Sequence, residues 1–311
     1  MKVVERTGHP NIATVYVAQS EAGDLVEYVE SVEPPIPRNQ KWVNIISTLY
    51  GCPVKCQMCD AGMQYRGRLS TDEMLFQVDD LVQRRYPDRV IPCEKWKIQF
   101  ARMGDPAFNP DVLELLRQLP AKYEAPGLFP SLSTIAPAGC DRFFDQLIDI
   151  KRELYPERFQ FQFSLHTTDE NTRRRLIPVR TWSFDRMGEY GEAIYGGIGR
   201  RPTLNFALMQ DVPVQLDVLL RYFSPDVFLI KLTPLNPTFR SRESGLASLY
   251  DTPDVWNALV DRLRNAGYPV IESVGELEEN AIGSNCGQYI EAIRREEKLP
   301  EGSYTYSHET I

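Results

Sequence analysis

The chain reads WVNIISTLYGCPVKCQMCD from residue 42 to residue 60, so three cysteines closely follow an apolar, β-branched segment. Three thiols this close together cannot all point into one apolar core. Thiolates are, however, the preferred ligands of cubic iron–sulfur clusters, which normally take four cysteines. No fourth cysteine lies near Cys52, Cys56 and Cys59 in the sequence. The spacing therefore predicts a [4Fe-4S] cluster with three protein ligands and one iron left open for chemistry.

Two other uses of these cysteines fit less well. A structural zinc site takes four ligands, usually as two separated pairs. A disulfide would pair two of the three thiols and leave one over. The residues after Met1 lead into no apolar run, so we expect no signal peptide and a reducing, cytoplasmic location.

The overall composition is that of a globular protein. The chain has 311 residues, of which 42% are hydrophobic and 25% charged, enough for one large domain or two small ones. No stretch has the length of a membrane helix, so we expect no membrane partner. A net charge of -8 argues against a broad phosphate-binding face. We interpret the one basic run, Arg173-Arg174-Arg175, as a solvated helix face.

The hydrophobic pattern divides the chain into three parts. Residues 1–41 hold two alternating segments and a proline-rich linker, which predicts a small N-terminal β-extension. Residues 42–275 alternate between strand and helix patterns and form the predicted core. Residues 276–311 form a C-terminal loop and tail. Strands are predicted at residues 42–47, 95–101, 128–134, 159–165, 203–209, 227–232 and 270–274. Helices are predicted at residues 71–85, 110–118, 140–154, 184–195, 214–222 and 253–266.

Six alternating units favour parallel pairing with right-handed crossovers. The predicted fold class is therefore α/β, a partial (β/α)6 TIM-like barrel. Reactive groups of such folds gather at the carboxyl ends of the strands. The cysteine loop follows the first strand of the core. Short polar or glycine-rich pieces lie at the ends of four later strands: Arg102-Met103-Gly104-Asp105-Pro106, Ser133-Thr134, Ser164-Leu165-His166 and Pro234-Leu235-Asn236-Pro237.

Together, the cysteine spacing and these strand-end pieces resemble the radical S-adenosylmethionine (SAM) superfamily, and within it the RlmN/Cfr group of RNA adenine methyltransferases. The resemblance runs from about residue 26 to residue 290. It implies a partial barrel, a [4Fe-4S] cluster, SAM, and a reductant such as flavodoxin or ferredoxin. It also implies that SAM is bound by Gly104, Asp105, Ser133, Ser164, His166 and Asn236. Alternatives are an ordinary turn at residues 104–106 and a purely structural role for His166.

Near the C-terminus, Asn285-Cys286-Gly287-Gln288 resembles the segment whose cysteine is methylated in that group. There, SAM first methylates the cysteine, and a deoxyadenosyl radical then activates that methyl group for attack on an sp2 carbon. The resemblance implies a methyltransferase with Cys286 as its catalytic residue. Flanking glycine, serine and asparagine predict an exposed, flexible loop, and a buried structural thiol is the alternative.

The chain departs from the family pattern in two respects. The family's second cysteine, which releases the product, corresponds to Ile45 here. Cys140 is a possible substitute, and Cys93 is expected at the opposite face, although both fit plain core thiols. The family's N-terminal accessory helical domain has no counterpart. A glutamate proposed as proton acceptor matches Glu27 and Glu30 equally well.

Three functions remain open from the sequence. The leading one is a radical SAM methyltransferase acting through Cys286. The second is a radical SAM enzyme that abstracts hydrogen from a small molecule or peptide without methyl transfer. The third is an iron–sulfur protein for electron transfer, which would not need the SAM-binding pieces. An RNA base, a small molecule and a peptide all remain possible substrates.

Overall fold

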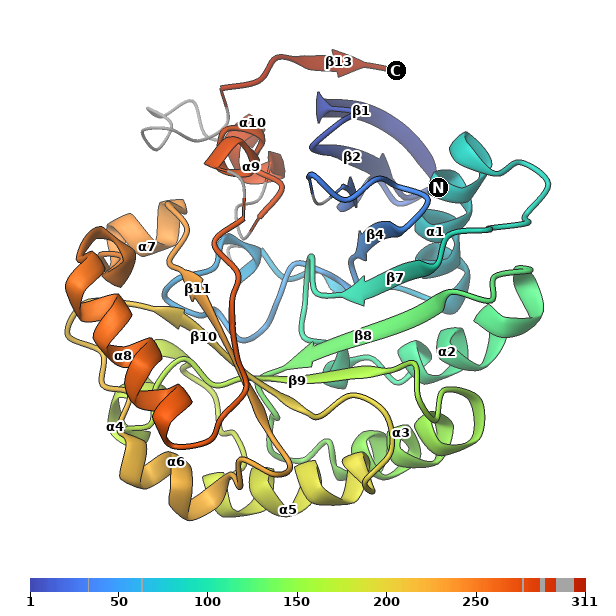
Figure 1. Cartoon of the computed structure of the whole chain (residues 1–311). Helices are drawn as coiled ribbons and strands as arrows, with labels where there is room; N and C mark the ends of the chain where they lie inside the picture. The colour runs from blue at the N-terminus through green and yellow to red at the C-terminus, as the bar shows by residue number, and fades with distance from the viewer. Residues whose placement is uncertain (33, 63, 276, 286–288, 295–304) are drawn as a thin grey trace.

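A computed structural model describes residues 1–32, 34–62, 64–275, 277–285, 289–294 and 305–311. Within them, the main sheet has 11 strands in the order β12-β11-β10-β9-β8-β7-β4-β3-β2-β1-β13. One part of it is parallel and curves into a partial barrel (Figure 1), which confirms the predicted fold class. The parallel strands are β4 (Lys41–Ile46), β7 (Lys95–Phe100), β8 (Leu128–Thr134), β9 (Gln160–Ser164), β10 (Thr203–Leu208), β11 (Leu229–Pro234) and β12 (Val270–Glu272).

Helices alternate with these strands and cover the outside of the barrel (Figure 1). They are α1 (Thr71–Arg85), α2 (Asp111–Lys122), α3 (Asp141–Leu154), α5 (Phe184–Tyr195), α6 (Leu216–Tyr222) and α8 (Pro253–Asn265). The start of α1 shows why the sequence predicts it well. Ser70 and Glu73 form a capping box, in which each side chain accepts the other residue's backbone N–H.

Shorter elements occupy the loops after the strands. They are α4 (Glu170–Leu176), α7 (Phe239–Glu243), η1 (Asp60–Gly62), η2 (Pro106–Phe108) and η3 (Leu249–Asp251), with the small sheet of β5 (Leu49–Tyr50) and β6 (Gly67–Arg68). Within the described part of the chain, no helix is long and apolar enough to cross a membrane.

Strand β7 carries apolar residues outward and polar residues inward. In β7, Trp96, Ile98 and Phe100 are fully buried in the core, whereas Gln99 lines the barrel cavity. Lys97 shares the face of Gln99, because successive residues of a strand point to opposite sides. Barrel interiors are usually filled with branched apolar residues. This interior is lined by lysine, glutamine, asparagine and serine instead, which leaves room for polar ligands.

Both ends of the chain meet beside the barrel. β1 (Lys2–His9), β2 (Ala13–Gln19) and β3 (Leu25–Ser31) form an antiparallel extension that joins the barrel through β3 and β4. β13 (His308–Thr310) pairs with β1. α9 (Leu277–Ile282) packs on β1 and β2, and α10 (Tyr289–Arg294) packs on β3. In Figure 1, the red C-terminal elements accordingly lie beside the blue N-terminal strands. Neither β1 nor β13 was predicted.

Candidate active site

A cavity of about 330 Å³ opens at the carboxyl ends of the parallel strands. It brings together residues that are far apart in the sequence. The residues singled out from the sequence that line it are Cys52, Cys56, Cys59, Gly104, Asp105, Ser133, Ser164, His166 and Asn236. The strand-end argument therefore located one common site.

Hydrogen bonds fix the cysteine loop at both of its ends. The buried Asn109 side chain donates to the carbonyl of Thr48, before the loop, at 2.8 Å and to that of Leu69, after it, at 2.7 Å. Inside the loop, the Asp60 carboxylate accepts the backbone N–H of Arg240 at 2.9 Å. The loop is thus attached to the α2 region and to the chain that follows β11, so its shape does not depend on a ligand alone.

The three thiols fit an iron–sulfur cluster better than a single metal ion. Among the described residues, no three histidine, cysteine, aspartate or glutamate side chains are arranged to hold one ion. A cubic cluster instead takes each thiolate at a different corner. Burial raises the pKa of Cys52 to about 11 and raises that of Cys56 further. Both thiols are therefore protonated at neutral pH until a metal displaces their protons.

Arg173 lies next to the cavity lining, and the sequence interpretation missed its burial. The solvated helix face expected for the basic run is wrong for this residue, which is 3% exposed, although Arg174 and Arg175 are exposed. Its Nη2 donates to the carbonyl of Ile135 at 2.9 Å, and its charge opposes the rise in the pKa of Cys56. Its Nε and Nη1 are buried without a hydrogen-bond partner among the described residues. The burial of Arg173 could have been predicted from its spacing. Leu176 lies one helical turn later on the same face and is also buried.

Asp105 links the end of β7 to the end of β8. Its Oδ1 accepts from the Thr134 hydroxyl at 2.9 Å, and its Oδ2 accepts from the Ile135 backbone at 2.7 Å. Burial raises its pKa to about 6. A carboxylate oxygen has two acceptor sites, so Oδ2 retains capacity for one more donor from the cavity.

Gly104 has a structural reason to be glycine. Its φ is +90°, and an added Cβ would lie 2.4 Å from the Leu49 side chain. The positive φ and the close packing against Leu49, just before the cysteine loop, both require glycine at this position. Any close approach to a ligand would be an additional reason.

His166 is held as a neutral imidazole. Its Nδ1 accepts the backbone N–H of Ala207 at 3.1 Å, which leaves the ring proton on Nε2. Burial, assisted by the charge of Arg173, lowers its pKa to about 3. Its backbone φ of +64° lies in the left-handed region, which non-glycine residues rarely adopt. The site thus offers a fixed N–H donor at the mouth of the barrel.

A buried ion pair holds the C-terminal segment against the barrel. Arg102, just after β7, donates its Nε to Glu27 of β3 at 3.0 Å, and both side chains are almost completely buried. Arg102 also donates to the carbonyls of Gly283, Ser284 and Asn285 at 2.8, 3.0 and 2.7 Å.

Glu27 completes this arrangement from the other side. Its Oε1 accepts the backbone N–H of Ile290. Burial raises the pKa of Glu27, and the adjacent Arg102 guanidinium limits that rise. The pair therefore binds the chain both before and after residues 286–288.

Cys286 lies outside the described residues. Its neighbours Ser284 and Asn285 line the cavity, and Ser284 is 2% exposed. Arg102 holds the carbonyls of residues 283–285, and the exposed, flexible loop expected around Cys286 stays a prediction.

The structure separates the two candidate glutamates. Glu30 lies on the opposite face of β3, where it pairs with Arg85 at 2.8 Å and accepts from the Trp42 indole at 2.9 Å. Glu27, in contrast, contacts the segments that flank Cys286. The role of proton acceptor stays a prediction for either residue. Glu30 serves packing between β3 and α1.

The remaining thiols lie apart from the cavity lining, whereas Ile45 belongs to it. Cys93 is fully buried before β7, at the opposite end of the barrel, and its thiol donates to the carbonyl of Arg38 at 3.1 Å. Cys140 caps the start of α3 and does not line the cavity in the described structure.

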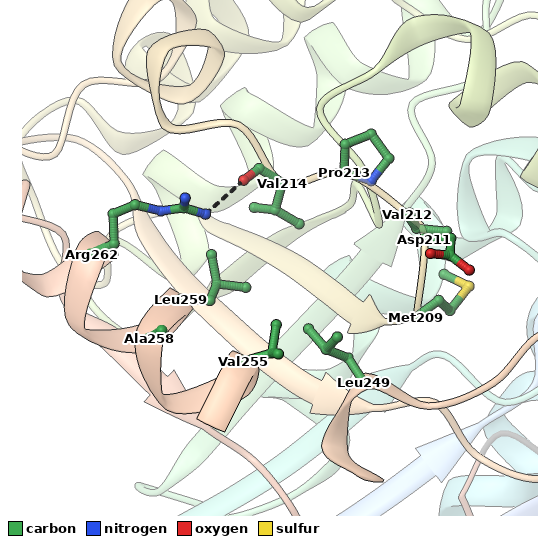
Figure 2. Close-up of a pocket in the computed structure, with 10 residues that line it drawn as sticks. All are labelled: Met209, Asp211, Val212, Pro213, Val214, Leu249, Val255, Ala258, Leu259 and Arg262. Carbon is green, nitrogen blue, oxygen red and sulfur yellow. Dashed lines mark hydrogen bonds between the residues drawn. The ribbon is translucent and has the colours of Figure 1, made fainter. Parts of the chain in front are cut away.

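A second hollow, of about 580 Å³, lies outside the barrel between α8 and the loop after β10 (Figure 2). Val255, Leu259 and Arg262 of α8 face residues 209–214 across it, and Arg262 donates to the carbonyl of Val214 at 3.3 Å. The described lining contains no cysteine or histidine. We therefore place the chemistry in the barrel.

Comparisons with known proteins find similarity over most of the chain. No family model matches the chain. A probable dual-specificity RNA methyltransferase RlmN from Salinispora arenicola is 29% identical over 258 residues, which cover 79% of this chain and 64% of that protein. A protein of the same name from Thermus thermophilus is 28% identical over 283 residues, covering 85% of this chain and 72% of the relative.

A solved radical SAM methyltransferase from Sphaerobacter thermophilus has the same fold, with a TM-score of 0.71 and 21% identity over 93% of this chain and 80% of its own. The resemblance to RlmN-type radical SAM methyltransferases is thus confirmed. The chain spans less than two thirds of the length of the Salinispora relative.

The buried Glu27–Arg102 ion pair leads to a prediction about the stability of the folded chain. Arg102→Met leaves the Glu27 carboxylate buried without its counter-ion, so we expect the free energy of unfolding to fall by about 3–5 kcal/mol. Denaturant unfolding measures this loss. Replacing both members, as Glu27→Leu with Arg102→Met, should recover part of the stability while residues 283–290 become more sensitive to protease. A single variant as stable as the wild type would contradict this role.

Proposed function

We propose that the chain is a radical SAM methyltransferase that adds a methyl group to an sp2 carbon through Cys286. One observation supports this most strongly: three thiols and the strand-end residues line one cavity, beside a segment around Cys286 that a buried ion pair holds. An electron-transfer protein has no need for such a cavity. When bound, the cluster and SAM would supply a deoxyadenosyl radical after one-electron reduction by a flavodoxin- or ferredoxin-like partner.

The chain's own residues have distinct tasks in this proposal. Cys52, Cys56 and Cys59 hold the cluster. Asp105 accepts the SAM ammonium on Oδ2, and His166 donates its Nε2–H.

Ser133, Ser164 and Asn236 supply further polar contacts to SAM. Arg173, with its unpaired buried N–H groups, balances negative charge beside Cys56.

Cys286 acts as the methyl carrier. Its thiolate attacks the sulfonium methyl of one SAM, the carbon–sulfur bond of the donor breaks, and S-adenosylhomocysteine leaves. The Glu27–Arg102 pair holds residues 283–285 and Ile290, on either side of Cys286 in the chain, and orientation contributes much of the rate of such transfers.

A second candidate function is hydrogen abstraction without methyl transfer. Ile45 lines the cavity where the family resemblance places a product-releasing cysteine. Methyl transfer through Cys286 would then need another way to release the product. The names of the relatives favour RNA as substrate, whereas the net charge of -8 favours a smaller one.

The cluster is tested by its ligands. We expect anaerobically prepared protein to hold about four irons and four sulfides, and Cys52→Ala, Cys56→Ala and Cys59→Ala together to remove them. Iron analysis and absorbance measure the loss. Cys93→Ala, at the far end of the barrel, should retain the cluster. Iron that survives the triple replacement would overturn the assignment.

The SAM site is tested at Asp105. A charge-assisted hydrogen bond contributes about 1.5–3 kcal/mol. Asp105→Asn should therefore weaken SAM binding by about tenfold to a hundredfold while iron content is unchanged. Asp105→Glu keeps the charge and should bind SAM better than Asp105→Asn does. Equal SAM affinity in wild type and Asp105→Asn would show that the ammonium lies elsewhere.

The methyl-carrier role is tested at Cys286. Cleavage of SAM requires the cluster, an electron and bound SAM, whereas methyl transfer also requires this thiol. Cys286→Ala should thus still form 5′-deoxyadenosine under reductant but lose S-adenosylhomocysteine. Mass spectrometry of wild-type peptides should find a methyl group on Cys286. Wild-type protein that makes no S-adenosylhomocysteine with its substrate would favour hydrogen abstraction instead.

A further inference from the structure

The short helix α4, which follows β9, is attached to the cysteine loop. The carbonyl of Leu176 accepts the backbone N–H of Gln57 at 2.9 Å, between the second and third cysteines of the loop. Leu176 also belongs to a buried apolar cluster against which Cys56 and Cys59 pack. The helix therefore forms part of the wall behind these thiols.

Arg173 is buried in this wall, one helical turn before Leu176. Only 3% of the residue is exposed. Its Nη2 donates to the carbonyls of Ile135 and Ser164 at 2.9 and 3.3 Å, and both of these residues line the cavity. The chain at the ends of β8 and β9 thus fixes the position of the guanidinium.

The charge of Arg173 acts on the second cysteine of the loop. Burial lowers the pKa of Arg173 to about 10, so the side chain stays charged at neutral pH, and an ionised Cys56 opposes that fall more than Asp105 or Glu170 does. Burial raises the pKa of Cys56, the charges of Cys52 and Asp105 add to the rise, and the charge of Arg173 opposes it. These interactions agree with the packing of α4 on the loop.

The guanidinium keeps unused hydrogen-bonding capacity. Its Nε and Nη1 are buried without a partner among the described residues. The Asp105 carboxylate is bonded elsewhere, because it accepts from the Thr134 hydroxyl and from the backbone of Ala107 and Ile135. Arg173 is not part of the cavity lining in the described structure, so SAM in the cavity does not contact it. Its charge instead acts across a short span of protein.

We propose that Arg173 raises the reduction potential of the cluster held by Cys52, Cys56 and Cys59. Reduction adds one negative charge to the cluster, and a fixed positive charge close by stabilises that added charge. Net charge and hydrogen bonds to the sulfurs are among the factors that set the potentials of such clusters. Arg173 is therefore a positioning residue that acts through the cluster. The proposal rests on the proposed function only in taking the three cysteines as cluster ligands.

Burial distinguishes this arginine from its neighbours in the basic run. A charge acts more strongly in a medium of low dielectric constant than in water, and solvent and salt screen exposed charges. Arg174 and Arg175 are exposed, so their charges are screened. Asp105, in contrast, is buried beside the loop and disfavours added negative charge there. We therefore expect Arg173 to offset the effect of Asp105 on reduction, and the other two arginines to contribute little.

The test measures the potential of the cluster itself. Cluster-loaded protein is titrated with a low-potential reductant and followed by electron paramagnetic resonance, at a pH well above the value of about 6 to which burial raises the pKa of Asp105. In Arg173→Met, reduction should be about tenfold less favourable, a shift of about 59 mV to a more negative potential. Arg174→Met removes the same charge from an exposed position of the same helix and should titrate like the wild type.

A charge-conserving variant separates this role from a structural one. Arg173→Lys keeps the charge, so its potential should lie closer to that of the wild type than to that of Arg173→Met. Equal potentials in Arg173→Lys and Arg173→Met would show that only the bonds to Ile135 and Ser164 matter, and would overturn the proposal. A wild-type potential in Arg173→Met would overturn it as well.

Iron analysis covers the case in which a variant does not assemble the cluster. If Arg173→Met holds no iron, Arg173→Gln serves as the neutral variant and should show the same negative shift. Failure of both neutral variants to hold iron would assign Arg173 to cluster assembly and contradict a role in setting the potential.

Two outcomes distinguish the possible sources of failure. If the enzyme holds the cluster and forms S-adenosylhomocysteine with its substrate, but the potential is the same with and without Arg173, the role of Arg173 is wrong and the proposed reaction stands. If anaerobically prepared wild-type protein holds no iron, the cluster assignment and the role of Arg173 are both wrong.

Discussion

The buried Glu27–Arg102 pair is the interaction on which the rest of the site depends. Two charges away from water are tolerated when they compensate each other and their remaining hydrogen-bonding groups are satisfied. Here the satisfying groups come from the C-terminal segment, through the carbonyls of residues 283–285 and the N–H of Ile290. The β-extension, the barrel and the C-terminal segment therefore fix one another's positions.

Local patterns explain why so much of the fold was predictable. α1 has a capping box at Ser70 and apolar residues at helical spacing, and β8 is a short apolar strand that begins after a turn. Both were predicted with their observed bounds. β1 and β13 were not, because the pairing of Glu5 with Thr310 joins residues at opposite ends of the chain. No local pattern carries that information.

The same limit applies to the site. The cysteines and Asp105 were found because each belongs to a short motif at a strand end. Arg102 lies in the same strand-end piece as Asp105, and Arg173 lies in the basic run, but their burial follows from partners that only the folded chain supplies. Glu27 and Glu30 were indistinguishable in sequence, although residues three apart in a strand face opposite sides. The deciding fact was which side of β3 faces the C-terminal segment.

The strand order has a consequence for how the chain folds during synthesis. From β4 to β12, neighbours in the sheet are also neighbours along the chain, so each unit has its partner as soon as it is synthesised. The bond between Glu27 and Ile290, in contrast, spans 263 positions. The cysteine loop of a growing chain can thus be folded long before the ribosome has made the C-terminal segment. That segment completes the cavity beside the loop. We expect loading of the metal centre and closure of the reaction chamber to be separate events in the maturation of this protein.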